Sequence, residues 1–183
     1  FMWLRNRKAI IGRFLLSLIV LVIIAYGTIT PFVGKLSIVD ISTTVGRTET
    51  LTERSEIWAF LVPYALEELM VGHGYGGFWT DEMREHSSSH AHNGYLDVIL
   101  NLGLVGVFSL TIFLLSCSRK FQASLLHEYD WGVLAFGILL MAITHNIAES
   151  TIVGLAHSLS AVLLFMAVTP EPGTSYRNAV VSG

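Results

Sequence analysis

The sequence has few of the charged residues with which a water-soluble protein covers its surface. Only 14% of its 183 residues are charged, whereas a soluble domain has about 25%. Hydrophobic residues make up 52%, and the mean hydropathy is +0.60. Because long apolar runs alternate with short polar stretches, this composition excludes a large water-facing surface and indicates a chain solvated by lipid.

Cysteine and positive charge are scarce as well. Cys117 is the only cysteine, which excludes an intramolecular disulfide, and its place at the end of an apolar run favours a packing role over a reactive thiol. The net charge is −3, and the few basic residues are scattered or lie beside apolar runs. The charge pattern therefore gives no indication of a nucleic-acid partner.

Four apolar segments predict an all-α, multi-pass membrane protein. The first has the length of a spanning helix. Its basic start also fits a secretory signal, but the apolar stretch is longer than a signal core and no small-residue cleavage site follows it. The segments cover residues 9–29, 95–116, 131–146 and 152–168.

Basic residues near the span ends predict the orientation, because cytoplasmic loops are rich in lysine and arginine. Such residues precede the first span, and Arg119 and Lys120 follow the second, so both of these ends are expected in the cytoplasm. Residues 1–30 then form a first transmembrane segment with a basic cytoplasmic start. The rest comprises a large extracytoplasmic loop (31–94), three transmembrane helices (95–168) and a cytoplasmic tail (169–183).

The large loop is expected to contain an amphipathic helix over residues 50–69, which Pro63 should kink or break. After it, Gly72, Gly74 and Gly77 formally match the nucleotide-binding pattern G-x-G-x-x-G, but a helix rather than a strand precedes them. We therefore expect a tight turn with positive φ values. The apolar face of the helix should carry Ile57, Phe60, Leu61 and Tyr64.

The segment HSSSHAHN carries His86, His90 and His92. It is open to three interpretations: a solvated loop with incidental histidines, a metal site, or a catalytic histidine that exchanges a proton near neutral pH. The metal interpretation is the weakest, because no cysteine lies near and the two-residue spacing does not suit one face of a helix.

Asn93, Asp97 and Asn101 follow at four-residue intervals and form one polar stripe at the start of the second span. Polar residues inside a membrane usually face other helices or a wet cavity, so the stripe predicts either a hydrogen-bonding seam or a substrate-lining surface. At the outer end of the third span, polar residues either cap a short turn or complete one site with the histidines; these are His145, Asn146 and Glu149.

Arg47 and Arg54 lie beside the start of the predicted loop helix. Extracytoplasmic arginines are usually solvated. Next to a helix N-terminus, however, two guanidinium groups and the free backbone N–H groups are well suited to bind phosphate oxygens.

Three motifs in this order, GRTETLTERSEIW, GHGYGGFW and SSHAHNGYLDVILNLGLVG, resemble the O-antigen ligase and polymerase family, especially its exopolysaccharide-production branch. The segment HNIAES and the apolar run after it are similar to the family's C-terminal pair of spans. The resemblance covers about residues 45–168. It departs from the family pattern at Glu53, where a glycine is usual, and in having fewer spans, so we expect the C-terminal portion of a larger enzyme.

The resemblance implies an inverting glycosyltransferase of the bacterial inner membrane that needs neither metal nor cofactor. Such enzymes transfer a glycan from undecaprenyl diphosphate to a hydroxyl of an acceptor glycan or lipid, as polymerases or ligases. Membrane lipids and polysaccharide assembly proteins are the further partners expected. A flippase or transporter component, whose polar stripe lines a translocation path, and a non-catalytic assembly partner are the alternatives.

The resemblance also assigns roles to individual residues. Arg54, in the R-x-x-x-W position, matches the arginine expected to hold the diphosphate. His92, in the H-N pair, matches the histidine expected to act on the acceptor hydroxyl. Around these two catalytic residues, substrate binding is predicted for Arg47, His90, Asn93, Asp97 and Glu149.

Overall fold

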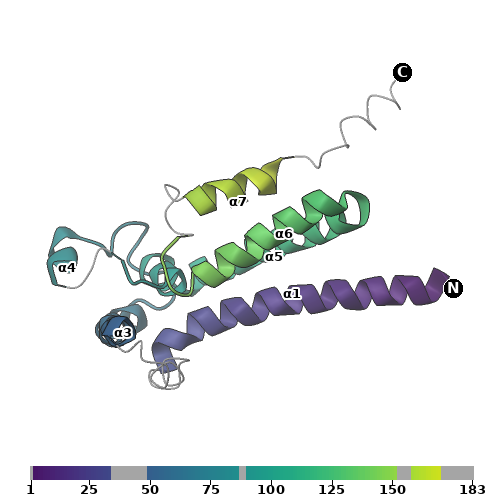
Figure 1. Cartoon of the computed structure of the whole chain (residues 1–183). Helices are drawn as coiled ribbons and strands as arrows, with labels where there is room; N and C mark the ends of the chain where they lie inside the picture. The colour runs from purple at the N-terminus through teal and green to yellow at the C-terminus, as the bar shows by residue number, and fades with distance from the viewer. Residues whose placement is uncertain (1, 34–48, 87–89, 152–157, 170–183) are drawn as a thin grey trace.

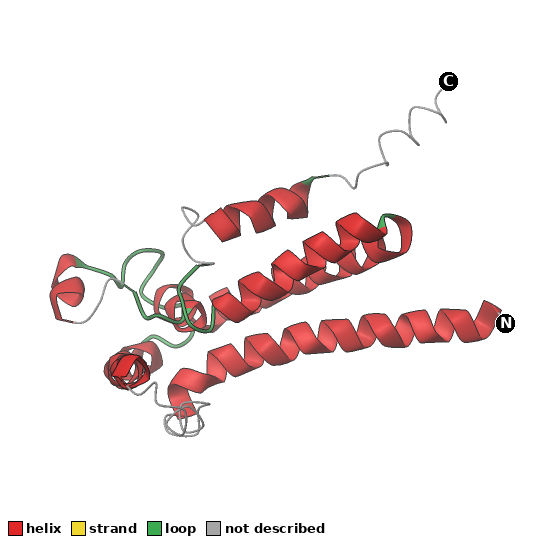
Figure 2. Ribbon diagram, viewed as in Figure 1, coloured by secondary structure: helices red, strands yellow, loops and turns green. Residues whose placement is uncertain are grey.

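The computed structural model describes residues 2–33, 49–86, 90–151 and 158–169. Within these ranges the chain consists of helices and connecting loops, and no strand is present (Figure 2). The predicted all-α fold is therefore confirmed. The helices are α1 (Met2–Val33), α3 (Glu49–Glu67), α4 (Asp81–His86), α5 (Gly94–His127), α6 (Tyr129–His145) and α7 (Ser158–Val168).

Among the described residues, two helical segments are long and apolar enough to cross a bilayer, namely Phe14–Val33 of α1 and Gly94–His127 of α5. Large apolar side chains on both point outward, such as Phe14 and Phe108, which are 67% and 68% exposed. Exposed apolar surfaces of this kind are suited to contact with lipid. The chain is therefore an all-α membrane protein. The third and fourth spans stay predictions, because α7 has only 11 residues and its length of about 17 Å is short of a hydrocarbon core of about 30 Å.

The long helices form a bundle, and the candidate site lies at one end of it. In Figure 1, α1, α5, α6 and α7 run along a common direction, whereas α3 is seen almost along its axis at the end opposite the N-terminus. Val20 and Ile24 of α1 pack with Phe121 of α5 and Leu139 of α6 in the bundle core. A smaller core joins α3 to the start of α5, through Trp58, Leu61, Ala65, Leu96 and Leu100.

Helices α1 and α5 extend beyond the apolar segments that predict them. Helix α1 includes Pro31, where the loop was expected to begin. Helix α5 continues past residue 116, so Arg119 and Lys120 lie within it rather than after it. The Lys120 ammonium donates to the carbonyls of Met166, Ala167 and Thr169 at 3.1, 2.6 and 2.7 Å. A positive charge at the C-terminal end of α7 stabilises that helix.

Helix α3 forms where the sequence predicts it, with a different buried face. Pro63 lies inside the helix and does not end it. Trp58, Leu61 and Ala65 are buried at 8%, 0% and 1% exposed, whereas Phe60 is 39% exposed. The expectation that Phe60 belongs to the buried face is therefore wrong. Its ring instead contacts the Tyr64 ring, with the centroids 5.4 Å apart.

Helix α5 is interrupted at Gly103, whose φ of 61° is not helical. The turn after α3 crosses it there. The amides of Leu104 and Val105 donate to the carbonyls of Leu69 and Met70 at 2.8 and 3.2 Å. The break therefore exposes no unpaired amide at these two positions, which is the condition for irregular backbone at membrane depth.

Glycines on both crossing segments permit this close approach. A Cβ on Gly72 would lie 2.5 Å from the carbonyl carbon of Asn101, and one on Gly103 would lie 2.4 Å from that of Met70. Gly72, Gly74 and Gly76 have φ values of 65°, 90° and 73°. The predicted glycine turn is therefore present. Gly76, rather than Gly77, supplies its third positive φ.

Replacement of Gly103 with alanine should destabilise the protein. With φ at 61° and ψ at −157°, Gly103 adopts a conformation that is almost restricted to glycine; another residue there costs about 1–3 kcal/mol, and the new methyl group would overlap the crossing backbone. We expect a lower midpoint of thermal unfolding in detergent. Gly137→Ala in α6 is the matched control, because its Cβ meets nothing within 4 Å. That change should stabilise the helix by about 0.5–1 kcal/mol, and equal midpoints for the two variants would contradict the role given to the crossing.

Candidate active site

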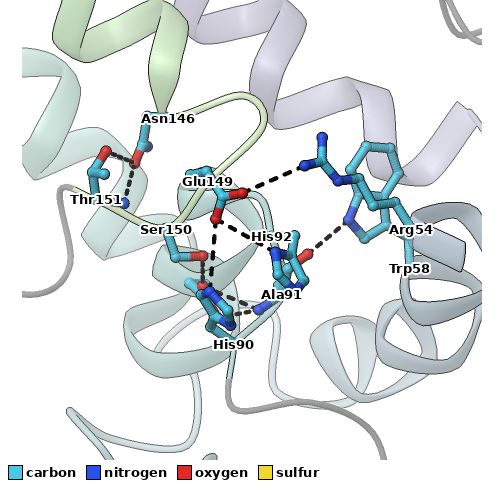
Figure 3. A network of polar contacts seen from close by, with 10 residues as sticks. Arg54, Trp58, His90, Ala91, His92, Asn146, Glu149, Ser150 and Thr151 are labelled. Carbon is cyan, nitrogen blue, oxygen red and sulfur yellow. Dashed lines mark hydrogen bonds and ion pairs between the residues drawn. The ribbon is translucent and has the colours of Figure 1, made fainter. Parts of the chain in front are cut away.

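Glu149 lies at the centre of a polar cluster to which three segments of the chain contribute (Figure 3). Its Oε1 is 3.4 Å from Nη2 of Arg54 on α3. Its Oε2 is 3.4 Å from Nδ1 of His92 and 3.7 Å from Nε2 of His90. The four side chains are 27–37% exposed. They are therefore held in place by the fold and are still within reach of a substrate.

The backbone around His92 has an unusual conformation. Within the described ranges, His92 is the non-glycine residue with a positive φ, at 49°. This region is uncommon for residues with a side chain, although histidine tolerates it better than most. The next residue, Asn93, caps the N-terminus of α5, where its Oδ1 accepts from the amides of Tyr95 and Leu96 at 3.0 Å. Strained residues of this kind concentrate at functional sites.

The backbone of Ala91, between the two histidines, is held by hydrogen bonds to both its carbonyl and its amide. Its carbonyl accepts from the Trp58 indole N–H at 2.9 Å. Its amide donates to the two carboxylate oxygens of Asp97 at 3.3 Å each. Trp58 lies one turn after Arg54, so both side chains project from the same side of α3. The spacing in the R-x-x-x-W motif thus lets one helix hold the histidine loop and also present an arginine to it.

The polar stripe of α5 connects the helix to the segments around it. Asn93, Asp97 and Asn101 are 0%, 2% and 2% exposed. The Asn93 amide group donates to the carbonyl of Gly27 in α1 at 3.1 Å, and the Asn101 Oδ1 accepts from the amide of Gly76 at 2.9 Å. Of the two interpretations of the stripe, this arrangement supports the hydrogen-bonding seam.

Of the three polar residues that the sequence singles out around the turn after α6, one joins the cluster. Glu149 contacts both histidines and Arg54. Asn146 is buried, and its Oδ1 accepts from the amide and the hydroxyl of Thr151 at 3.2 and 3.3 Å. Asn146 thus holds the turn, whereas His145 is exposed at its edge. Both interpretations of this turn therefore apply, each to a different residue.

Some of the predicted residues lie outside the described residues: Arg47, and the side chains of Glu53 and His86. Conversely, three residues that hold the site were not predicted, namely Trp58, Trp79 and Ser150. A sequence signal existed for Trp58, which is four residues after Arg54. Nothing in the sequence pairs Ser150 with Asp97, 53 positions away.

His90, His92 and Glu149 also have the composition of a metal site. Their candidate ligand atoms all lie within 4.8 Å of one another, and zinc accepts two histidines and a carboxylate. The Arg54 guanidinium is 3.4 Å from the same carboxylate, however. It places a positive charge beside the position that a cation would occupy, which favours the predicted metal-free site.

The family model described as O-antigen ligase matches residues 1–111, which include Arg54, both histidines and Asp97. The matched part thus extends to the N-terminal helix, while Glu149 lies beyond it. Comparisons with curated proteins and with solved structures gave no significant match. The chain belongs to the O-antigen ligase family, whose members are membrane glycosyltransferases of the ligase or polymerase type.

Proposed function

We propose that the protein transfers a glycan from an undecaprenyl-diphosphate carrier to an acceptor hydroxyl, with inversion at the anomeric carbon and without a metal. The observation that carries this proposal is the cluster in which one carboxylate, Glu149, contacts both histidines and Arg54. It brings together a base, a group that orients the base, and a cation suited to a diphosphate. The cluster lies at the end of the bundle that the basic residues predict to be extracytoplasmic.

His92 is the proposed general base. A carboxylate next to Nδ1 favours the tautomer that carries its proton on Nδ1, which leaves the basic lone pair on Nε2. Nε2 then takes the proton of the acceptor hydroxyl as its oxygen attacks the anomeric carbon. The bond between that carbon and the diphosphate breaks on the opposite face, so one glycosidic bond forms and undecaprenyl diphosphate leaves.

Arg54 is proposed to stabilise the leaving diphosphate. Negative charge grows on the phosphate oxygens as the bond breaks, and a fixed guanidinium favours that change without moving. Its 3.4 Å contact with Glu149 is longer than a strong charge-assisted hydrogen bond, which is about 2.7–2.9 Å. The Arg54 guanidinium therefore retains the capacity to bind a phosphate group. Arg47 is the second arginine proposed for this task.

An apolar groove beside the crossing supports a lipid-linked donor. It has a volume of about 650 Å³ and lies between α5 and α7. Its walls include Val71 and Tyr75 of the glycine turn and Leu102, Val105 and Phe113 of α5. Isoprenoid units of a carrier would bury apolar surface there while the diphosphate reached toward the end of the bundle.

The purified complete protein, incubated with undecaprenyl-diphosphate glycan and an acceptor, tests this function. Formation of acceptor-linked glycan together with free undecaprenyl diphosphate is expected. Movement of the lipid-linked glycan across a vesicle membrane without any new glycosidic bond would instead favour the transporter alternative. The burial of Asp97 and Asn101 argues against that alternative, because a translocation path needs polar groups that face open space.

Chelation of divalent metals should leave the rate unchanged. If the base is activated by Glu149 alone, transfer in excess EDTA should proceed at the rate of the untreated enzyme. The measurement is the initial rate of product formation after dialysis against chelator. Loss of activity that returns on addition of one divalent metal would overturn the metal-free mechanism and would point to His90, His92 and Glu149 as ligands.

A further inference from the structure

The Asp97 carboxylate accepts hydrogen bonds from three segments of the chain. Two of them carry members of the cluster, and the third, around Trp79, carries none. Its Oδ1 accepts from the Trp79 indole N–H at 2.9 Å. Both carboxylate oxygens accept from the amide of Ala91, and Oδ2 also accepts from the hydroxyl of Ser150. Ala91 lies directly between His90 and His92, and Ser150 directly follows Glu149. One carboxylate therefore anchors both sides of the contact between histidine and glutamate.

A substrate would not reach this carboxylate in the present arrangement. Asp97 is 2% exposed, in contrast to the 29% and 37% of the His92 and Glu149 side chains. Each of its oxygens already accepts two of the hydrogen bonds described above. A carboxylate that accepts only from protein groups orients them.

We propose that Asp97 is a positioning residue that sets the separation of His92 and Glu149, in place of the substrate contact expected from the sequence. This role rests on the proposed function, in which Glu149 orients the base. Asp97 acts on both residues through a single peptide bond, because Ala91 adjoins His92 and Ser150 adjoins Glu149. A displacement of about 1 Å at a catalytic group can cost about 100-fold in rate, so the anchor has a large effect on catalysis without touching the substrate.

Two single substitutions separate positioning from general stabilisation. Ser150→Ala and Trp79→Phe each remove one donor to Asp97 and leave the carboxylate in place. Ser150 lies next to Glu149, whereas the segment around Trp79 carries no member of the cluster. Ser150→Ala should lower kcat by about 10- to 100-fold with little change in KM for the donor. Trp79→Phe should lower the thermal midpoint at least as much and reduce kcat less.

A double-mutant cycle shows whether Ser150 acts through Glu149. In a Glu149→Gln background, Ser150→Ala should have almost no further effect on kcat, because the group that it positions no longer carries the charge that orients the base. Losses that multiply independently, or a full kcat in the Ser150→Ala variant, would overturn the proposal.

A cross-linking measurement tests the same anchor without catalysis. Cys117 is the only native cysteine and is buried, so cysteines placed at His90 and Glu149 are the accessible pair for a short thiol cross-linker. Linking should be efficient with Asp97 present and should fall several-fold in Asp97→Asn, where an amide N–H replaces one acceptor. Equal linking in both backgrounds would refute the anchor. If cross-linking falls in Asp97→Asn as expected but His92 variants keep full activity, the anchor stands and the proposed function alone is refuted.

Discussion

Replacement of His92 with asparagine is expected to lower kcat by about 10²- to 10⁴-fold, the usual contribution of a general base. Asparagine has no basic nitrogen to take the acceptor proton. It does tolerate the positive φ that His92 adopts, at 49°. The loss should therefore appear as reduced product formation by a protein that inserts and unfolds like the parent.

His92→Gly sharpens the test, because glycine adopts a positive φ without strain. If His92 serves catalysis, this variant should be as inactive as His92→Asn, with a thermal midpoint equal to or above that of the parent. His92→Ala is a weaker choice, since its methyl group retains the strain and combines two effects. Normal rates in both the asparagine and the glycine variants would show that another group accepts the proton.

Removal of the Arg54 guanidinium should have the second large effect. Arg54→Ala is expected to lower kcat by about 10²- to 10³-fold, as loss of a preorganised donor to a developing negative charge does. Arg54→Lys keeps the charge and loses the planar fork that binds phosphate through two parallel hydrogen bonds, so it should recover only part of the rate. Initial rates with saturating acceptor measure both.

Arg84→Ala is the matched control for Arg54. Arg84 lies on α4 in the same large loop and is exposed. Its loss changes the net charge by the same amount, and a rate near that of the parent is expected. A comparable fall in both variants would mean that the loop's overall charge attracts the donor, and the specific role of Arg54 would then be wrong.

The sequence predicts individual helices well and their ends less well. Hydropathy identifies the long apolar segments of α1 and α5. The hydropathy signal ends at the first charged residues, but the backbone hydrogen bonds of a helix continue through them. Lys120 is an example: it lies within α5, and its ammonium donates to three carbonyls at the end of α7. No local pattern contains that contact.

The candidate site shows the same division. Motif order identifies Arg54 and the two histidines, and the polar turn after α6 suggests Glu149. Which member of that turn enters the site depends on the close packing of α5 against α6, where the amide of Gly94 donates to the carbonyl of Asn146 at 2.9 Å. The Arg54–Glu149 contact joins residues 95 positions apart. Such pairing is a property of the assembled bundle, because periodicity describes only neighbours within one helix.

The crossing between the turn after α3 and α5 has a consequence for which substitutions this chain tolerates. Its two bonds run from the amides of Leu104 and Val105 to the carbonyls of Leu69 and Met70, so they belong to the main chain alone. A change of side chain at these four positions therefore leaves both donors and both acceptors in place. Alanine at any of these four positions would leave both bonds in place, whereas proline at position 104 or 105 lacks the amide hydrogen and would remove one of them.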